Sequence, residues 1–201
     1  MRRHEGMTLI EIAVVLAIIG ILAAVLTPIV TNYVDQARVA AAQSDVKTIA
    51  ESISRFEKDV GRYPMFANGT ILLPDSAATI IRLEGQGTAV TDTSGGASNW
   101  VNGSVSDTLD NQLLSNSPNY TAVASGGNLA APFRWKGPYG TSTADPWGRK
   151  YLVNITNAKS GSSFACFVLS AGPDGIVQTA FSISKTSAIS PSGDDIIYRI
   201  K

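Results

Sequence analysis

The residues of this chain best suited to chemistry are a few carboxylates near its two ends. Glu11 borders a long uncharged stretch, whereas Asp174 and the pair Asp194 and Asp195 lie in two short glycine-containing turns. Hard cations such as calcium take roughly six to eight oxygen ligands from carboxylates, backbone carbonyls and water. Because the two turns flank one loop, together they could form such a shell. The same residue types are also common in ordinary solvated turns.

Histidine and cysteine, the other residues that often do chemistry, are scarce. The single histidine, His4, lies in a short basic head, and the single cysteine, Cys166, lies in a strand-like apolar run where we expect an inert core thiol. One cysteine cannot form an intramolecular disulfide, so an exported domain would need another cross-link to stabilise its loops. A metal ion is a candidate for that cross-link. We find no nucleophile motif and no phosphate-binding glycine loop, and the sequence therefore predicts no enzyme.

The charge of the chain is balanced, with 16 Lys and Arg against 16 Asp and Glu. Proteins that bind nucleic acid usually carry an excess of positive charge on one face. The basic residues of this chain form no local cluster. The composition therefore predicts no nucleic-acid partner.

The segment after Glu11 is the most apolar part of the chain. Residues 12–34 contain no charge, and about 20 apolar residues suffice to cross a bilayer. A basic head before an apolar run fits a secretory signal peptide or a plain signal anchor as well. However, this run is longer than the usual core of a signal peptide and passes directly into another helical pattern. We predict that residues 7–34 form the membrane-spanning half of a longer helix.

The second half of that helix has a different pattern. Between residues 39 and 60 the apolar residues recur every three or four positions, as on one face of an amphipathic helix, and Gly61 then ends the pattern. We predict a nearly continuous helix from Leu9 to Val60, of which residues 35–61 pack against a head domain.

Glu11 has no cation near it in the sequence apart from the basic head. A carboxylate at the edge of a lipid-embedded segment is costly unless it is paired. If the chain is cut after Gly6, Met7 gains a free amino group and Glu11 becomes the fifth residue of the mature chain. Cleavage would therefore create a partner charge.

The residues around this cleavage point resemble those of a known family. Gly6 followed by Met7-Thr8-Leu9-Ile10-Glu11 resembles the prepilin motif of type IV pilins and type II secretion pseudopilins. The resemblance implies that a prepilin peptidase removes residues 1–6 and methylates the new terminus at Met7. It also implies that Glu11 pairs with the terminal amine of a neighbouring subunit and that Pro28 is the helix-kinking proline of the family. Met7 departs from the family, which usually has Phe at this position.

The middle of the chain, residues 62–132, gives weaker signals. Ser76–Leu83 and Asp107–Leu114 could form short helices. Gly85–Gly103 is rich in Gly, Ser and Thr and contains one aromatic residue, Trp100, so we expect a variable surface loop there.

The last part, residues 133–201, is expected to hold the sheet. Lys150–Ile155 and Ser163–Ser170 have the β-branched and aromatic content of strands. Asp145-Pro146-Trp147-Gly148 before them predicts a tight turn whose Trp enters the core. The fold class we expect is therefore α+β, with a long N-terminal helix packed on a small antiparallel β-sheet head.

Four segments of the head resemble the major pseudopilin of type II secretion systems: Gly61-Arg62-Tyr63-Pro64, the Asp145–Gly148 turn and the two acidic turns. The resemblance implies a pilin fold and a structural calcium ion. Carried over by position, Asp174 is a ligand carboxylate, Ala171 donates its backbone carbonyl, and Asp194 or Asp195 is the second carboxylate.

The resemblance also implies a function and a location. We expect a subunit that polymerises with copies of itself into a periplasmic pseudopilus, together with minor pseudopilins and an inner-membrane assembly platform. The chain would cross the inner membrane once, with its head in the periplasm. The alternative is the pilin of a surface fibre for adhesion, motility or DNA uptake. A membrane-anchored enzyme or binding module is a third possibility, for which the sequence shows no convergent polar site.

Overall fold

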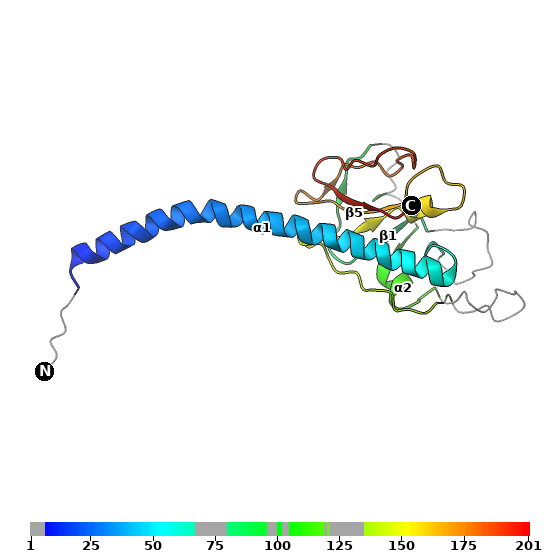
Figure 1. Cartoon of the computed structure of the whole chain (residues 1–201), viewed down its shortest axis with the longest axis horizontal. Coiled ribbons are helices and arrows are strands. Elements are labelled where there is room, and N and C mark those ends of the chain that lie inside the picture. Colours follow the sequence, from blue (N-terminus) through cyan, green and yellow to red (C-terminus); the bar gives the residue numbers. More distant parts are fainter. Residues whose placement is uncertain (1–6, 67–79, 96–99, 102–104, 119, 121–134) are drawn as a thin grey trace, which may run out of the picture. The chain divides into compact units, whose positions relative to one another are not determined.

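The computed structural model describes residues 7–66, 80–95, 100–101, 105–118, 120 and 135–201. The predicted leader with Gly6 lies outside these described residues. The chain divides into two units, residues 1–38 and residues 39–201. Helix α1 (Leu9–Val60) begins in the first unit and ends in the second, as predicted (Figure 1).

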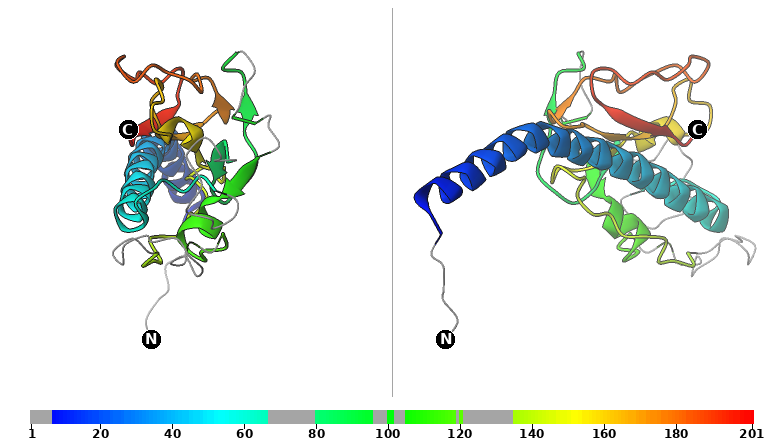
Figure 2. Two further views of the ribbon diagram at one scale, coloured as in Figure 1. Left: turned by 90° about the vertical axis from the view of Figure 1, so that its right-hand side faces the viewer. Right: turned by 60° about the vertical axis from the view of Figure 1, so that its left-hand side comes forward.

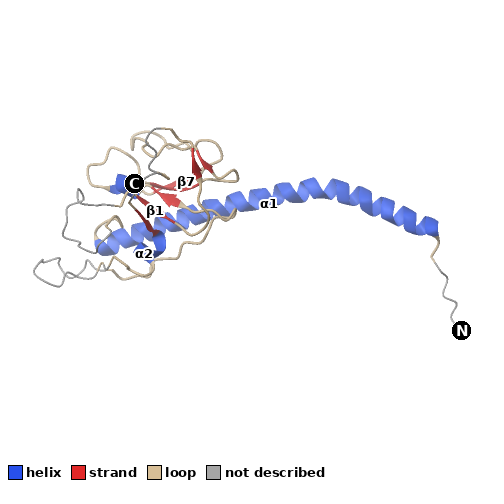
Figure 3. Cartoon of the chain, turned by 180° about the vertical axis from the view of Figure 1, so that it is seen from behind, coloured by secondary structure: helices blue, strands red, loops and turns tan. Residues whose placement is uncertain are grey.

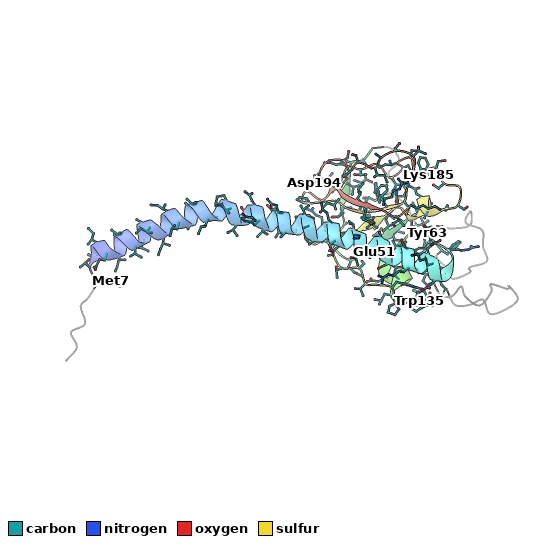
Figure 4. The ribbon with its side chains drawn as sticks, in the orientation of Figure 1. Met7, Glu51, Tyr63, Trp135, Lys185 and Asp194 are labelled. Carbon is teal, nitrogen blue, oxygen red and sulfur yellow. The ribbon has the colours of Figure 1, made fainter. Side chains whose placement is uncertain are left out.

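Within the first unit, residues 12–34 of α1 carry no charge and are exposed on all sides. Every described side chain from residue 7 to residue 38 is exposed, and Figure 4 shows side chains pointing outward all around the helix. The most apolar 18-residue window of α1 has a mean hydropathy of 3.0, and by length and composition the helix could cross a membrane. The helix continues through Gly20 and Pro28, and the Thr27 hydroxyl near the proline donates to the carbonyl of Ala23 at 2.7 Å.

The part of α1 that lies in the second unit buries one face, as its periodicity predicts. The buried apolar residues are spaced three or four apart: Ala42, Val46, Ile49, Ala50, Ile53, Phe56 and Val60. Burying a large apolar side chain stabilises a fold by about 1.5–3 kcal/mol. The helix ends at Gly61, which adopts a φ of 77° and donates its N–H to the carbonyl of Glu57 at 2.7 Å. Glycine enters this left-handed conformation without steric cost.

In the described residues of the head there are two sheets and two short helical elements. The five-stranded sheet has the order β3 (Ser106–Thr108), β1 (Arg82–Glu84), β4 (Leu152–Val153), β5 (Phe167–Ser170), β7 (Ile196–Arg199). The smaller sheet pairs β2 (Thr91–Asp92) with β6 (Ile176–Val177), and the helical elements are α2 (Leu109–Leu113) and the 3₁₀ helix η2 (Ile155–Ala158). Figure 3 colours the strands red and the helices blue, and Figure 2 shows the strands of the head gathered on one side of residues 39–60 of α1.

The α+β class is confirmed, but the sheet is mixed rather than antiparallel. β1 pairs with β4 in antiparallel and with β3 in parallel orientation. Parallel neighbours need a crossover connection, and here the chain passes through β2 and Trp100 before it returns as β3. The parallel edge therefore follows from the long segment between β1 and β3.

Two predictions for the middle segment can be compared with the described residues. The helix expected near Asp107–Leu114 is present as α2, and Thr108 caps it by accepting the N–H of Asn111 at 3.1 Å. The helix expected over Ser76–Leu83 is wrong at its C-terminal end, because Arg82 and Leu83 lie in β1; residues 76–79 lie outside the described part. Three apolar residues, Ile80, Ile81 and Leu83, fit the burial pattern of a strand as well as that of a helix turn.

The central strands of the five-stranded sheet, β4 and β5, are buried on both faces. Along β5, Val168 packs in the same cluster as α1, whereas Phe167 and Leu169 belong to a second cluster. This second cluster also contains Val90 and Trp100, which are 9% and 1% exposed. The expectation of a surface loop over Gly85–Gly103 is therefore wrong at these two residues, because they cover the face of the sheet that α1 leaves open.

The Asp145-Pro146-Trp147-Gly148 turn forms as predicted. The Asp145 carboxylate, which is 4% exposed, accepts the N–H groups of Trp147 and Arg149 through Oδ1, at 3.0 and 2.8 Å, and the hydroxyl of Ser170 through Oδ2 at 2.8 Å. Gly148 adopts a φ of 82°, and Trp147 packs half-buried against the core on the α1 side. One buried carboxylate therefore joins the turn to the end of β5.

Replacing Asp145 by Ala removes the acceptor of three hydrogen bonds, and should lower the free energy of unfolding by about 2–4 kcal/mol, because buried donors without partners are costly. Asp145→Asn keeps one acceptor oxygen and should cost clearly less. Chemical denaturation of both variants measures the difference. Equal losses for Ala and Asn would contradict the role given to the carboxylate oxygens.

Cys166 should be inert in the folded protein. Its side chain is fully buried, and burial raises the pKa of the thiol to about 12. Since the thiolate is the nucleophile, an alkylating reagent at neutral pH should label Cys166 only as fast as the head unfolds. Labelling followed by mass spectrometry, with and without denaturant, tests this. Rapid labelling of the native protein would show that the thiol is accessible.

Candidate functional site

Glu11 takes part in a capping box at the start of α1. Its carboxylate Oε2 accepts the backbone N–H of Thr8 at 2.7 Å and the hydroxyl of Thr8 at 2.9 Å. The Thr8 hydroxyl in turn accepts the N–H of Glu11 at 3.3 Å. This reciprocal pattern of Thr and Glu three residues apart satisfies N–H groups that the first turn of a helix otherwise leaves without partners.

The capping box gives Glu11 a role that the sequence analysis did not assign. The signal was present in the spacing of Thr8-Leu9-Ile10-Glu11, which is the usual capping sequence. The hydrogen bonds hold the carboxylate beside Thr8, one residue after Met7. The charge predicted to pair with a neighbouring amine therefore sits in a fixed place relative to the predicted mature terminus.

The first acidic turn follows β5 and is bonded to the side chain of Arg149. The guanidinium donates through Nη1 to the carbonyl of Gly172 at 2.7 Å. Gly175 adopts a φ of 73°, and a Cβ at this position would lie 2.2 Å from Cζ of Arg149. The turn therefore needs glycine at residue 175 both for its backbone conformation and for the close approach of the guanidinium.

The two acidic turns contact each other, as the calcium prediction requires. The backbone N–H of Asp174 donates to Oδ2 of Asp194 at 3.1 Å. A Cβ at Gly172 would lie 2.3 Å from the carbonyl oxygen of Asp194, so the backbones of the two turns lie close together. Figure 4 labels Asp194, which is half-buried in the head.

The other predicted ligands of the first turn are engaged within that turn. Oδ1 of Asp174 accepts the N–H of Ile176 at 2.7 Å. The carbonyl of Ala171 accepts the N–H of Gly175 at 3.2 Å. A carbonyl and a carboxylate each have further lone pairs, so each of these oxygens can still accept a second partner such as a cation.

Asp195 is the most buried of the candidate carboxylates, with 4% of its surface exposed. Its Oδ2 accepts the N–H groups of Gln178 and Thr179 at 2.9 and 2.6 Å. Burial raises the pKa of Asp195, and the negative charge of Asp194 raises it further, against the effect of these hydrogen bonds. A carboxylate that is costly to ionise is one that a nearby cation would stabilise.

The remaining oxygens of this pair are suited to a hard cation. Oδ1 of Asp194 and Oδ1 of Asp195 are buried without a hydrogen-bond partner among the described residues. Within the same part of the chain, no three Asp, Glu, His or Cys side chains converge as a metal-binding group. A cation at this place would therefore bind at most two carboxylates, Asp194 and Asp195. Backbone carbonyls and water would complete its shell. That oxygen-only set fits calcium.

Comparison with known proteins agrees with the sequence motif at the start of the chain. Residues 1–27 match the family described as the prokaryotic N-terminal methylation motif. The chain is 44% identical over 68 residues to the type II secretion system core protein G of Pseudomonas aeruginosa. These 68 residues cover 34% of this chain and 48% of the relative. It is 34% identical over 68 residues to the proteins of the same name from Aeromonas hydrophila and Dickeya chrysanthemi, covering 48% and 44% of those relatives.

These matches cover only part of each protein. The chain spans about half the length of the curated relatives it matches, and the similarity lies in its N-terminal third. No solved structure matches the chain significantly. The chain thus carries the N-terminal methylation motif of type IV pilin-like proteins, and its N-terminal third is similar to that of the type II secretion core protein G.

Proposed function

We propose that this chain is the major pseudopilin of a type II secretion system, a structural subunit that polymerises into a pilus-like fibre and drives protein export across the outer membrane. The observation that carries the proposal is the first half of α1, which is exposed and apolar on all sides and begins with the carboxylate of Glu11. The methylation motif over residues 1–27 supports it.

The helix α1 is longer than a bilayer is thick, so lipid can surround only part of it. Its 52 residues extend for about 78 Å at 1.5 Å per residue, whereas the hydrocarbon core of a bilayer is about 30 Å thick. The uncharged part, residues 12–34, is just long enough to cross that core. In a fibre the same surface would instead pack against the helices of other copies, so that one apolar segment serves storage in the membrane and assembly.

The proposal includes processing and partners. A prepilin peptidase would cleave between Gly6 and Met7 and methylate the amine of Met7. The subunit would be anchored in the inner membrane with its head in the periplasm, and would assemble with copies of itself, minor pseudopilins and an inner-membrane platform. Its role is structural rather than enzymatic, and it needs no nucleic acid.

A surface pilus is the second candidate function. It is favoured by the long segment between β1 and β3, which adds Val90 and Trp100 to the second buried cluster. Such an enlarged head would suit the exposed surface of a fibre. Electron microscopy of producing cells separates the two functions, since a surface pilus extends beyond the cell and a secretion pseudopilus stays within the periplasm.

Calcium is proposed as a structural ligand of the two acidic turns. Asp194 and Asp195 would hold it through the oxygens that lack hydrogen-bond donors, and the carbonyl of Ala171 would add a neutral ligand. Asp174, the other predicted ligand, would come to the ion only in place of one of these two carboxylates. The bound ion would neutralise two adjacent carboxylates and tie the turn after β5 to the segment before β7. It would thereby replace the disulfide that the chain cannot form.

Replacing Glu11 by Ala should leave membrane insertion intact and abolish fibre assembly, because the charge that pairs with the terminus of a neighbour is lost. The capping box makes a sharper control available. Glu11→Gln keeps an oxygen that can cap the helix and removes only the charge, whereas Thr8→Ala removes the capping hydroxyl and keeps the charge. Fibre yield in cells, with membrane fractionation as the insertion assay, measures all three variants.

The two controls separate the roles of Glu11. Glu11→Gln should fail to assemble as completely as Glu11→Ala, and Thr8→Ala should reduce assembly only mildly. Normal fibres from Glu11→Gln would refute the charge-pairing role and leave helix capping as the function of this residue.

Calcium should raise the melting temperature of the head in the full-length chain in detergent. Ligand concentrations about 100-fold above the dissociation constant stabilise a folded state by about 2.7 kcal/mol. A chelator should reverse the shift, and the double variant Asp194→Asn with Asp195→Asn should not respond to calcium. Asp35→Asn, which removes a charge from an exposed position of α1, serves as the matched control. An identical melting curve with calcium and with chelator would sink the metal assignment.

A further inference from the structure

We propose that Trp100 is a positioning residue for the two acidic turns, and that it holds the loop that carries Asp195 in the conformation that binds calcium. The inference rests on the cation site of the proposed function and extends it to a segment for which the sequence predicted only a surface loop.

Trp100 reaches the acidic loop through its indole nitrogen. The side chain is 1% exposed, and its Nε1–H donates to the backbone carbonyl of Thr179 at 2.8 Å. The indole ring also meets Phe167 of β5 and Phe181 edge to face, with centroids 5.6 and 4.8 Å away. The donor is therefore fixed between the sheet and the loop.

Thr179 passes this contact on to the second acidic turn. The peptide N–H of Thr179 donates to Oδ2 of Asp195 at 2.6 Å, and its hydroxyl accepts the N–H of Ser192 at 3.0 Å. One residue thus connects the Trp100 indole to the Asp195 carboxylate and to the residue that begins the Ser192–Asp195 turn. Fixing Thr179 fixes the side of Asp195 that does not face the proposed ion.

The same segment of the chain also holds the first acidic turn. The N–H of Thr91 donates to the carbonyl of Gly175 at 3.0 Å, and the N–H of Thr93 donates to the carbonyl of Val177 at 2.9 Å. These bonds accompany the parallel pairing of β2 with β6. Thr91, Thr93 and Trp100 therefore bond to three carbonyls that lie between the two acidic turns in the chain, those of Gly175, Val177 and Thr179.

Preorganisation explains why these contacts would matter for affinity. A loop that is already ordered loses less conformational entropy when the ion binds, and this difference appears in the dissociation constant. A single intramolecular hydrogen bond contributes on the order of 1 kcal/mol, which corresponds to about fivefold in an equilibrium constant. Loss of the indole donor should therefore weaken calcium binding by about fivefold to tenfold.

Trp100→Phe removes the indole donor, and Trp135→Phe is its matched control. Trp135 packs against Tyr139 beside the core on the α1 side, and its buried indole nitrogen has no hydrogen-bond partner among the described residues. The control makes the same chemical change without removing such a bond. Benzothienylalanine at position 100, which keeps the size of the ring and lacks the N–H, provides a second variant if Trp100→Phe folds poorly.

The test uses the full-length chain in detergent. Calorimetric titration with calcium chloride gives the dissociation constant, and hydrogen exchange of the calcium-free protein gives the opening of the amides of Gln178 and Thr179. We expect the Trp100 variants to bind calcium about fivefold to tenfold more weakly and to exchange these two amides faster. Trp135→Phe should match the wild type in both measurements.

Two results would overturn the positioning role: unchanged exchange at Gln178 and Thr179 in the Trp100 variants, or faster exchange with unchanged calcium affinity. The titration of the wild type is read first. If the wild type takes up no calcium, the cation site of the proposed function fails and the inference fails with it. If the wild type binds and only the comparison between variants fails, the cation site stands and Trp100 has no role in it.

Discussion

The constraint on which the rest of this structure depends is the apolar surface of residues 12–34 of α1, whose side chains are exposed. Residues 12–34 carry no charge and are exposed all around α1. Water is a poor solvent for such a surface, so lipid or other copies of the helix must surround it. Glu11, held by Thr8 at the start of the helix, then becomes a charge that has to be matched at a defined height. Both features support the proposed assembly into a fibre.

The head meets a different demand, since it has to fold around the amphipathic half of the same helix. Val46, Ile53 and Phe56 cover one face of the five-stranded sheet, and the segment with Trp100 covers the other. The centre of the sheet is therefore buried on both faces, with one long helix among the described residues of the head. One acidic turn follows β5 and the other precedes β7. Trp100 of this second layer contacts Thr179, and Thr179 in turn is bonded to the turn before β7.

Much of this arrangement was predictable because it depends on periodicity and on local turn chemistry. The apolar run and the spacing of Val46, Ile49 and Ile53 gave α1 its bounds, and Asp145 with Gly148 marked a turn whose hydrogen bonds are short-range. Trp100 was missed because a single large residue in a polar segment has no period, and its place is decided by the uncovered face of a distant sheet. The strand at Arg82–Glu84 was missed for a related reason, since its pairing with β3 and β4 is non-local. The calcium ligands remain a prediction that the geometry of Asp194 and Asp195 makes chemically reasonable.

At the centre of the proposed function, the exposed half of α1 would form the inner surface of a fibre. Cryo-electron microscopy of fibres assembled from this chain tests that claim most directly, because it places the helices of neighbouring copies relative to one another. The account predicts that residues 9–34 of neighbouring copies pack together at the fibre axis, with Glu11 of one copy beside the amino group of Met7 in the next and the heads outside. A fibre held together by its heads alone, with these helices apart from one another, would contradict it.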